Sequence, residues 1–228
     1  MRIALFDIDG TLLASGGAGR RAMETALMEV FGSIGPAGYA YDGKTDRQIV
    51  RELMRADGRT DAEIEAGMPH VFARYLAELD VEKSAQAIRA LPGVEAVLDA
   101  LEPRDDVVLG LLTGNVIDGA RVKLGAAAID IERFVLGAYG SDHELRPELP
   151  RIARERAIAA LARDVPRDAL VVIGDTPLDI ACAHAQGARA LAVATGRFSM
   201  DELAAHAPAA VLASMADVDT TVRTILEC

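Results

Sequence analysis

The chain has 228 residues, 51% of them hydrophobic, which is enough to bury the core of one large domain or of a domain with a smaller insert. Its 35 acidic and 24 basic residues give a net charge of -11, and without any basic run this disfavours a nucleic-acid partner. Every apolar run is shorter than the roughly 18 residues of a membrane-spanning helix, and two cysteines without an export leader predict a cytoplasmic protein with no membrane partner.

The first thirteen residues organise the rest of the chain. An apolar run over residues 3–6 ends abruptly at Asp7, Asp9 and Gly10, which is typical of a buried parallel strand whose carboxyl end opens into a site. Side chains two apart on a strand point the same way, so we expect Asp7 and Asp9 to face one cavity. A simple turn at Asp9-Gly10 is the alternative, but it leaves Asp7 unexplained.

The next part of the chain predicts helices only. A glycine-rich linker over residues 14–19 precedes three segments with apolar residues at helical spacing. Thr45-x-x-Gln48 and Thr60-x-x-Glu63 fit capping boxes at the starts of the second and third helix. Helices with no strand between them should pack on one another, so residues 15–87 are expected to form an all-helical insert between the two parts of the main domain, 1–14 and 88–228.

Beyond Leu91-Pro92-Gly93 strands and helices alternate. This alternation predicts an α/β fold, a Rossmann-like parallel sheet covered on both faces, with its ligand site at the carboxyl ends of the strands. Asp7, Thr113 and Asp175 each follow such an end. The expected strands are 107–112, 134–136, 169–173, 190–193 and 209–212, and the expected helices begin near 115, 149, 177 and 218.

Two polar segments follow these strands. Thr113-Gly114-Asn115 would place a hydroxyl and free backbone amides at a helix start, either as an anion site or as an ordinary helix cap. In the segment 174–179, Thr176, Pro177 and Asp179 suit a helix start, but a purely structural role leaves Asp175 at the strand tip unexplained.

Together these motifs resemble the signatures of the haloacid dehalogenase superfamily of phosphohydrolases. The run Asp-x-Asp-Gly-Thr-Leu over residues 7–12 resembles the first signature, Thr113 the second, and Gly-Asp-x-x-x-Asp over residues 174–179 the fourth. The helical insert resembles the cap of the phosphoglycolate phosphatase-like and phosphomutase-like branch. The resemblance covers nearly the whole chain.

The resemblance implies a role for each matching residue. Asp7 would be the nucleophile that forms an aspartyl-phosphate, and Asp9 would protonate the leaving oxygen and then activate water. Thr113 would hydrogen-bond a phosphoryl oxygen. Asp7, Asp175 and the backbone carbonyl of Asp9 would hold Mg²⁺, with Asp179 beside them.

Charge repulsion supports the cation. Four carboxylates around a phosphate dianion bring about six negative charges together, and one like pair about 4 Å apart repels by about 4 kcal/mol at an effective dielectric of about 20. A single arginine does not offset this repulsion. A divalent, oxygen-preferring cation such as Mg²⁺ does.

The third signature of the family is a lysine or, in some members, an arginine. Arg146 is the best match and Arg151 the second, although either could instead pair with Glu144 or Glu148 on the surface. Lys123 lies eight residues beyond the expected helix start at Asn115, and a rise of 1.5 Å per residue puts it about 12 Å from the site. We therefore expect Lys123 to be too distant, and Lys44 and Lys83 belong to the insert.

Closure of the insert over the site would exclude water and select the substrate. The loop 43–46 is the candidate specificity loop, with Lys44, Gly114 and Asn115 as expected substrate-binding residues; a plain capping turn with a solvated lysine is the alternative. Cys182 is expected in the core. Neither Cys182 nor His184 is interpreted as a metal ligand, and terminal Cys228 has no expected role.

The leading interpretation is a magnesium-dependent phosphatase of a small phosphate monoester, phosphoglycolate-like or a sugar phosphate. Asp9 favours ester chemistry, because the dehalogenase and phosphonatase branches lack this acid. A phosphomutase would use the same residues, and a phosphate-binding or regulatory protein could keep the fold without turnover. The expected partner is a small phosphorylated metabolite; the sequence leaves its identity and the oligomeric state open.

Overall fold

The computed structural model describes residues 1–85 and 88–228, so the expected end of the insert at residue 87 lies outside the described residues. One six-stranded sheet, with every neighbouring pair parallel, has the order β5-β4-β1-β6-β7-β8. A two-stranded antiparallel ribbon joins β2 to β3. The strands are β1 (Arg2–Phe6), β2 (Leu13–Ala14), β3 (Arg89–Ala90), β4 (Val107–Thr113), β5 (Leu136–Tyr139), β6 (Leu170–Gly174), β7 (Arg189–Val193) and β8 (Ala210–Leu212).

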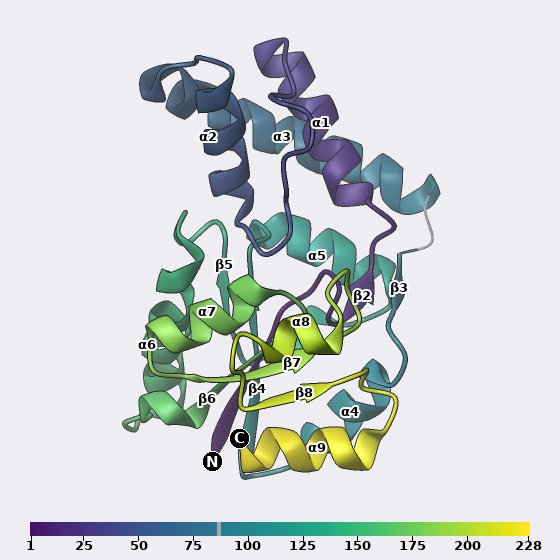
Figure 1. Ribbon diagram of the computed structural model, residues 1–228, viewed down its shortest axis with the longest axis vertical. Coiled ribbons are helices and arrows are strands. Elements are labelled where there is room, and N and C mark those ends of the chain that lie inside the picture. Colours follow the sequence, from purple (N-terminus) through teal and green to yellow (C-terminus); the bar gives the residue numbers. More distant parts are fainter. Residues whose placement is uncertain (86–87) are drawn as a thin grey trace.

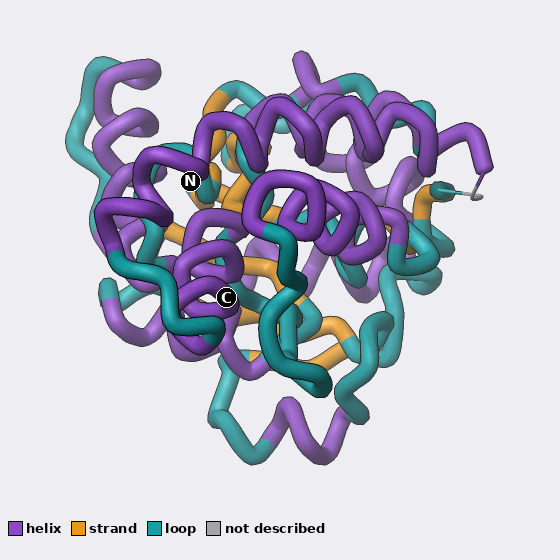
Figure 2. Tube along the Cα trace, turned by 90° about the horizontal axis from the view of Figure 1, so that it is seen from above, coloured by secondary structure: helices purple, strands orange, loops and turns teal. Residues whose placement is uncertain are grey.

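Strand β1 lies at the centre of the sheet and is buried on both faces. Its alternate side chains enter two separate apolar clusters, Ala4 and Phe6 on one face and Ile3 and Leu5 on the other. Helices cover both faces, with the strands in the interior (Figure 2). The expected parallel α/β sheet is confirmed, and its double burial explains why β1 is a continuous apolar run.

Nine α-helices are described. Helices α1, α2 and α3 lie together beyond the carboxyl ends of the strands, and α5 lies between them and the sheet (Figure 1). Their packing on one another agrees with the expected helical insert, but its limits at residues 14 and 87 stay a prediction. The helices are α1 (Ala18–Phe31), α2 (Asp46–Ala56), α3 (Asp61–Ala85), α4 (Val94–Leu101), α5 (Ile117–Ala126), α6 (Leu149–Leu161), α7 (Pro177–Ala185), α8 (Met200–Ala204) and α9 (Val218–Glu227).

The helix starts in the insert are set by local side chains. The Thr45 hydroxyl accepts a hydrogen bond from the Gln48 amide at the start of α2, and Thr60 and Glu63 form a reciprocal capping box before α3. The box at Thr45 is incomplete because the Gln48 side chain donates to Glu52 instead. Both predicted helix starts are therefore confirmed, one of them with half of the expected bonds.

Several elements differ from the sequence prediction. Strand β5 begins at Leu136 and not at residue 134, and β2, β3 and α8 carry too few periodic positions to be recognised. Helix α4 has apolar residues at helical spacing and is missing from the sequence prediction. The β2–β3 ribbon holds together the two chain segments that lead into and out of the helical insert. Among the described helices, none combines the length and apolar composition required to cross a bilayer.

Candidate active site

The central strands β4, β1 and β6 are neighbours, and each ends at a polar residue. Asp7 follows β1, Thr113 closes β4 and Asp175 follows β6. All three line one cavity of about 180 Å³, and residues of α1 and of the loop before α2 complete its walls. The chain runs from β1 to β4 and β5 on one side and then crosses to β6, β7 and β8 on the other. The strand order therefore reverses beside β1, which is the position at which open α/β sheets bind ligands. The expected convergence of the three strand ends is confirmed.

An acidic cluster lies at the cavity, and two of its members, Asp7 and Asp175, line it. Asp7, Asp175 and Asp179 are buried, and one carboxylate oxygen from each lies within 4.8 Å of the others. Burial, followed by the neighbouring acids, raises the pKa of Asp175 to about 8; burial raises the pKa of Asp7 to about 6 against the opposing effect of Arg146. Among the described residues, Asp7 Oδ1 accepts no well-aligned hydrogen bond, although the Arg146 guanidinium lies within ion-pair distance. Crowded oxygen ligands with an unsatisfied acceptor fit a hard divalent cation.

Arg146 stands against this cluster. It lies in the short turn η2 (Arg146–Glu148), is 3% exposed, and its Nη2 is 3.2 Å from Asp7 Oδ1 and also contacts Asp179 Oδ1. Burial opposes its charge, but the two carboxylates outweigh burial and raise its pKa. Arg151 instead lies on the surface with Glu148 and Glu155. The surface alternative thus describes Arg151, and Arg146 is the arginine in the site.

Asp179 has both a structural and a site role. Its Oδ2 accepts hydrogen bonds from the Thr176 amide (3.0 Å) and hydroxyl (2.7 Å) in a capping box at the start of α7, and its Oδ1 faces Arg146. Both oxygens are therefore engaged. Asp7 and Asp175 have more freedom to hold a cation, with Asp179 orienting Arg146 beside them.

Asp9 lines the same cavity but lies outside the acidic cluster. Its Oδ2 accepts hydrogen bonds from Lys123 Nζ at 2.6 Å and from Asn115 Nδ2 at 2.9 Å. Burial acts to raise the pKa of Asp9, but the Lys123 charge and these hydrogen bonds outweigh burial and lower it. Three of the four expected acids, Asp7, Asp175 and Asp179, lie together, whereas Asp9 pairs with Lys123. Asp9 lies apart because β1 ends at Phe6, so the alternation of the strand does not extend to Asp9.

The expectation that Lys123 is too distant is wrong. The rise along a helix measures only the distance from its end, whereas the Lys123 side chain reaches back to Asp9 across the space between α5 and the loop after β1. Asn115 lies two residues before α5, and the Lys123 ammonium donates to its amide oxygen at 2.6 Å. A single lysine within the apolar stripe of Ala120, Leu124 and Ala127 was the signal that could have identified it.

The segment 113–115 caps no helix. Helix α5 begins at Ile117, and the Thr113 and Asn115 side chains bond to each other. The Val116 amide donates to Asp46 Oδ2 at 2.8 Å, and the Ile117 amide donates to Ser141. The helix start expected near Asn115 is therefore wrong, and residues far away in sequence satisfy the amides of Val116 and Ile117. An anion site at Thr113 and Gly114 stays a prediction.

The loop 43–46 packs directly on the sheet end. The Asp46 amide donates to the Gly114 carbonyl at 2.8 Å, and a Cβ at Gly114 would lie 2.1 Å from the Lys44 carbonyl oxygen, so only glycine fits there. Lys44 lines the cavity, but its ammonium is bound to Glu52 (2.6 Å) and Tyr39 (3.0 Å). Lys44 is therefore not the solvated lysine of the alternative, and its role in substrate binding stays a prediction.

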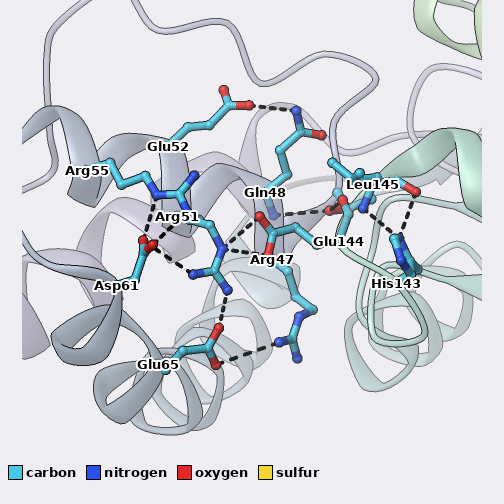
Figure 3. A network of polar contacts seen from close by, with 11 residues as sticks. Arg47, Gln48, Arg51, Glu52, Arg55, Asp61, Glu65, His143, Glu144 and Leu145 are labelled. Atoms are coloured by element: carbon cyan, nitrogen blue, oxygen red, sulfur yellow. Dashed lines mark hydrogen bonds and ion pairs between the residues drawn. The ribbon is translucent and has the colours of Figure 1, made fainter.

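A second contact joins the helical insert to the loop before Arg146. Arg51 Nε donates to both Glu144 carboxylate oxygens at 2.6 and 2.7 Å, and the Thr45 hydroxyl donates to the Glu144 carbonyl at 2.6 Å (Figure 3). Glu65 and Asp61 of α3 surround the same guanidinium. Glu144 precedes Arg146 by two residues, so α2 restrains the loop that leads to Arg146.

The hydrogen bond from the Val116 amide to Asp46 joins α2 to the segment before α5, and the titration of Asp46 makes the stability of the protein depend on pH. Burial raises its pKa to about 6, against the opposing effects of Lys123 and the Val116 amide. Since the unfolded pKa is about 3.9, the folded state binds more protons between these values, and stability falls as pH rises through that window. We expect Asp46→Asn, which keeps an acceptor for Val116, to gain about 2–3 kcal/mol over the natural protein between pH 4 and pH 7.

Urea unfolding of both proteins at several pH values measures this difference. The two curves should converge near pH 3.5, where both side chains are neutral. A constant difference at every pH would contradict the prediction.

The chain is similar to known proteins in part of its sequence and in its fold. Residues 148–218 match a family model described as HAD-hydrolase-like, where HAD denotes haloacid dehalogenase. A hydrolase from Pseudomonas syringae is similar over 98% of both chains at 22% identity, with a TM-score of 0.74. The chain has the haloacid dehalogenase-like fold.

Further structures with the haloacid dehalogenase-like fold resemble the chain over nearly its whole length. CbbY from Rhodobacter sphaeroides, in complex with phosphate, is 18% identical over 96% of both chains with a TM-score of 0.70. A protein described as a predicted phosphoglycolate phosphatase from Haemophilus somnus is 20% identical over 96% of both chains, with a TM-score of 0.68. No curated protein matches by sequence. The superfamily resemblance derived from the signatures is confirmed.

Proposed function

We propose that the protein is a magnesium-dependent phosphatase that hydrolyses a small phosphate monoester through an aspartyl-phosphate on Asp7. The observation that carries the proposal is the position of Asp7, at the end of the central strand, between Arg146 and Asp175 and inside the cavity. CbbY, which has a similar fold, binds phosphate, and this supports phosphate as the group that the cavity receives.

The residues around Asp7 suit phosphoryl transfer to its carboxylate. Asp7 attacks phosphorus, the P–O bond to the leaving group breaks, and Arg146 compensates the charge on the transferring group. Asp7 and Asp175, with the backbone carbonyl of Asp9, would hold Mg²⁺, which supplies further charge stabilisation when bound. The Thr113 hydroxyl accepts hydrogen bonds from Asn115, which leaves its own proton to donate toward a phosphoryl oxygen.

Asp9 handles the protons of both steps. It donates a proton to the leaving oxygen while Asp7 becomes phosphorylated. It then removes a proton from the water that attacks the aspartyl-phosphate, so that phosphate is released and both acids return to their starting states. Asp9 is held apart from the acidic cluster, which suits this separate task.

Phosphate release from a panel of phosphate monoesters, measured with Mg²⁺ and again with EDTA, tests the proposal. We expect release that depends on Mg²⁺. A folded protein that releases no phosphate from any member of a broad panel would favour the alternative, a phosphate-binding or regulatory protein.

A phosphomutase would use the same residues and differs only in the fate of the phosphoryl group. Incubation with a sugar phosphate and its bisphosphate separates the two activities. A phosphatase yields free phosphate, and a mutase yields an isomeric sugar phosphate with little release. We prefer the phosphatase, because it requires only that Asp9 activates a water molecule within the cavity.

A further inference from the structure

We propose that Lys123 and Asn115 are positioning residues that hold the carboxylate of Asp9 by one oxygen and leave its other oxygen to exchange the proton with the leaving group. This inference rests on the proposed function. It concerns a lysine on α5 outside the four family signatures.

The geometry is a closed triangle of side chains. Lys123 Nζ lies 2.6 Å from Asp9 Oδ2 and 2.6 Å from Asn115 Oδ1, and Asn115 Nδ2 lies 2.9 Å from Asp9 Oδ2. Lysine only donates hydrogen bonds, so the amide oxygen of Asn115 must face Lys123 and its NH₂ group must face Asp9. Each member thus fixes the orientation of the other two.

Both contacts reach the same oxygen of Asp9. Oδ2 receives the two hydrogen bonds, whereas neither residue contacts Oδ1, and the side chain of Asp9 is still 34% exposed in the cavity. Ser15 of the cavity wall also hydrogen-bonds the Asp9 carboxylate. Oδ1, which neither Lys123 nor Asn115 contacts, is the oxygen that carries the proton. When the ester P–O bond breaks, this proton passes to the leaving oxygen, and the carboxylate that remains is stabilised by the Lys123 charge.

Lys123 is confined to this position. It is 4% exposed, and a Cβ added to Gly19 of α1 would lie 2.8 Å from Nζ, so α1 packs closely on the ammonium. Among the described residues Asp9 is the carboxylate within salt-bridge distance of Lys123, whereas Arg146 serves Asp7. Lys123 thus pairs with Asp9 and Arg146 with Asp7, so proton transfer and phosphoryl transfer use separate ion pairs.

Two aryl phosphates distinguish a role in proton transfer from a merely structural one. Phenyl phosphate has a poor leaving group that needs protonation, whereas p-nitrophenolate leaves without it. We expect Lys123→Met to lower kcat/KM about 100-fold for phenyl phosphate and less than about 10-fold for p-nitrophenyl phosphate. The ratio kcat/KM is used because it reports the steps up to departure of the leaving group.

Further variants keep the test decisive. Lys83→Met is the matched control, because Lys83 is a surface lysine paired with Asp80, and it should change neither value. Asn115→Ala leaves no buried charge unpaired and should shift the two substrates in the same direction by a smaller factor, even where Lys123→Met is poorly folded. Lys123→Arg should restore part of the loss.

Each result has a clear meaning. Equal losses for both substrates in folded variants, or no loss, would overturn the positioning role while leaving the phosphatase intact. A folded natural protein that releases phosphate neither from the aryl phosphates nor from any member of the monoester panel would overturn the proposed function itself, and the positioning role with it, before any variant is made.

Discussion

Replacing Asp7 with asparagine is expected to lower kcat for Mg²⁺-dependent phosphate release by at least about 10⁴-fold, as typically follows loss of a nucleophile. The amide is uncharged and a poor nucleophile, and no other described carboxylate occupies the same position between Arg146 and the cavity. Phosphate release measured over time with the best monoester of the panel provides the value. The same variant should no longer retain label from a radioactive phosphate ester after acid quenching.

The stability of Asp7→Asn separates lost chemistry from lost folding. Asp7 is crowded by Asp175 and Asp179, so removing its charge should leave the free energy of unfolding unchanged or raised in the absence of Mg²⁺. Asp118→Asn, at an exposed position of α5, is the matched control and should keep full activity. Substantial phosphate release by a pure, folded Asp7→Asn protein would refute the assignment of the nucleophile.

Removal of Arg146 should produce the largest loss of stability. Its guanidinium is buried against Asp7 and Asp179, and deleting one partner of a buried ion pair costs about 3–5 kcal/mol because charge remains without compensation. We expect Arg146→Met to lower the free energy of unfolding by this amount in urea titrations without Mg²⁺, and to lower phosphate release as well. Arg146→Lys, which keeps the charge but not the two-sided geometry, should lose less.

Two comparisons sharpen this result. Arg151→Met removes an exposed arginine five residues away and should change stability by less than about 0.5 kcal/mol. Added Mg²⁺ should recover part of the stability of Arg146→Met, because a cation held by Asp7 and Asp175 compensates the same charge. If Arg146→Met were as stable as the natural protein, Arg146 would not be the group that balances the acidic cluster.

Local patterns in the sequence determined the architecture. Apolar runs of strand length alternating with helical periods predicted the parallel sheet, and the capping residues Thr45 and Thr60 predicted two helix starts, because these signals involve neighbours only. Asp7, Thr113 and Asp175 were recognisable because each lies at or directly after the end of a strand, and parallel strands bring their carboxyl ends to one edge.

Only the tertiary structure decided how the charges pair. Asp9 with Lys123, Asp46 with the Val116 amide, and Arg51 with Glu144 join segments that are 114, 70 and 93 residues apart. Spacing along one helix does not encode which other segment lies beside it, since that depends on how several elements pack at once. The sequence alone determined the fold and the acids at the strand ends; the packing of α5 and the helical insert determined which cation meets which acid.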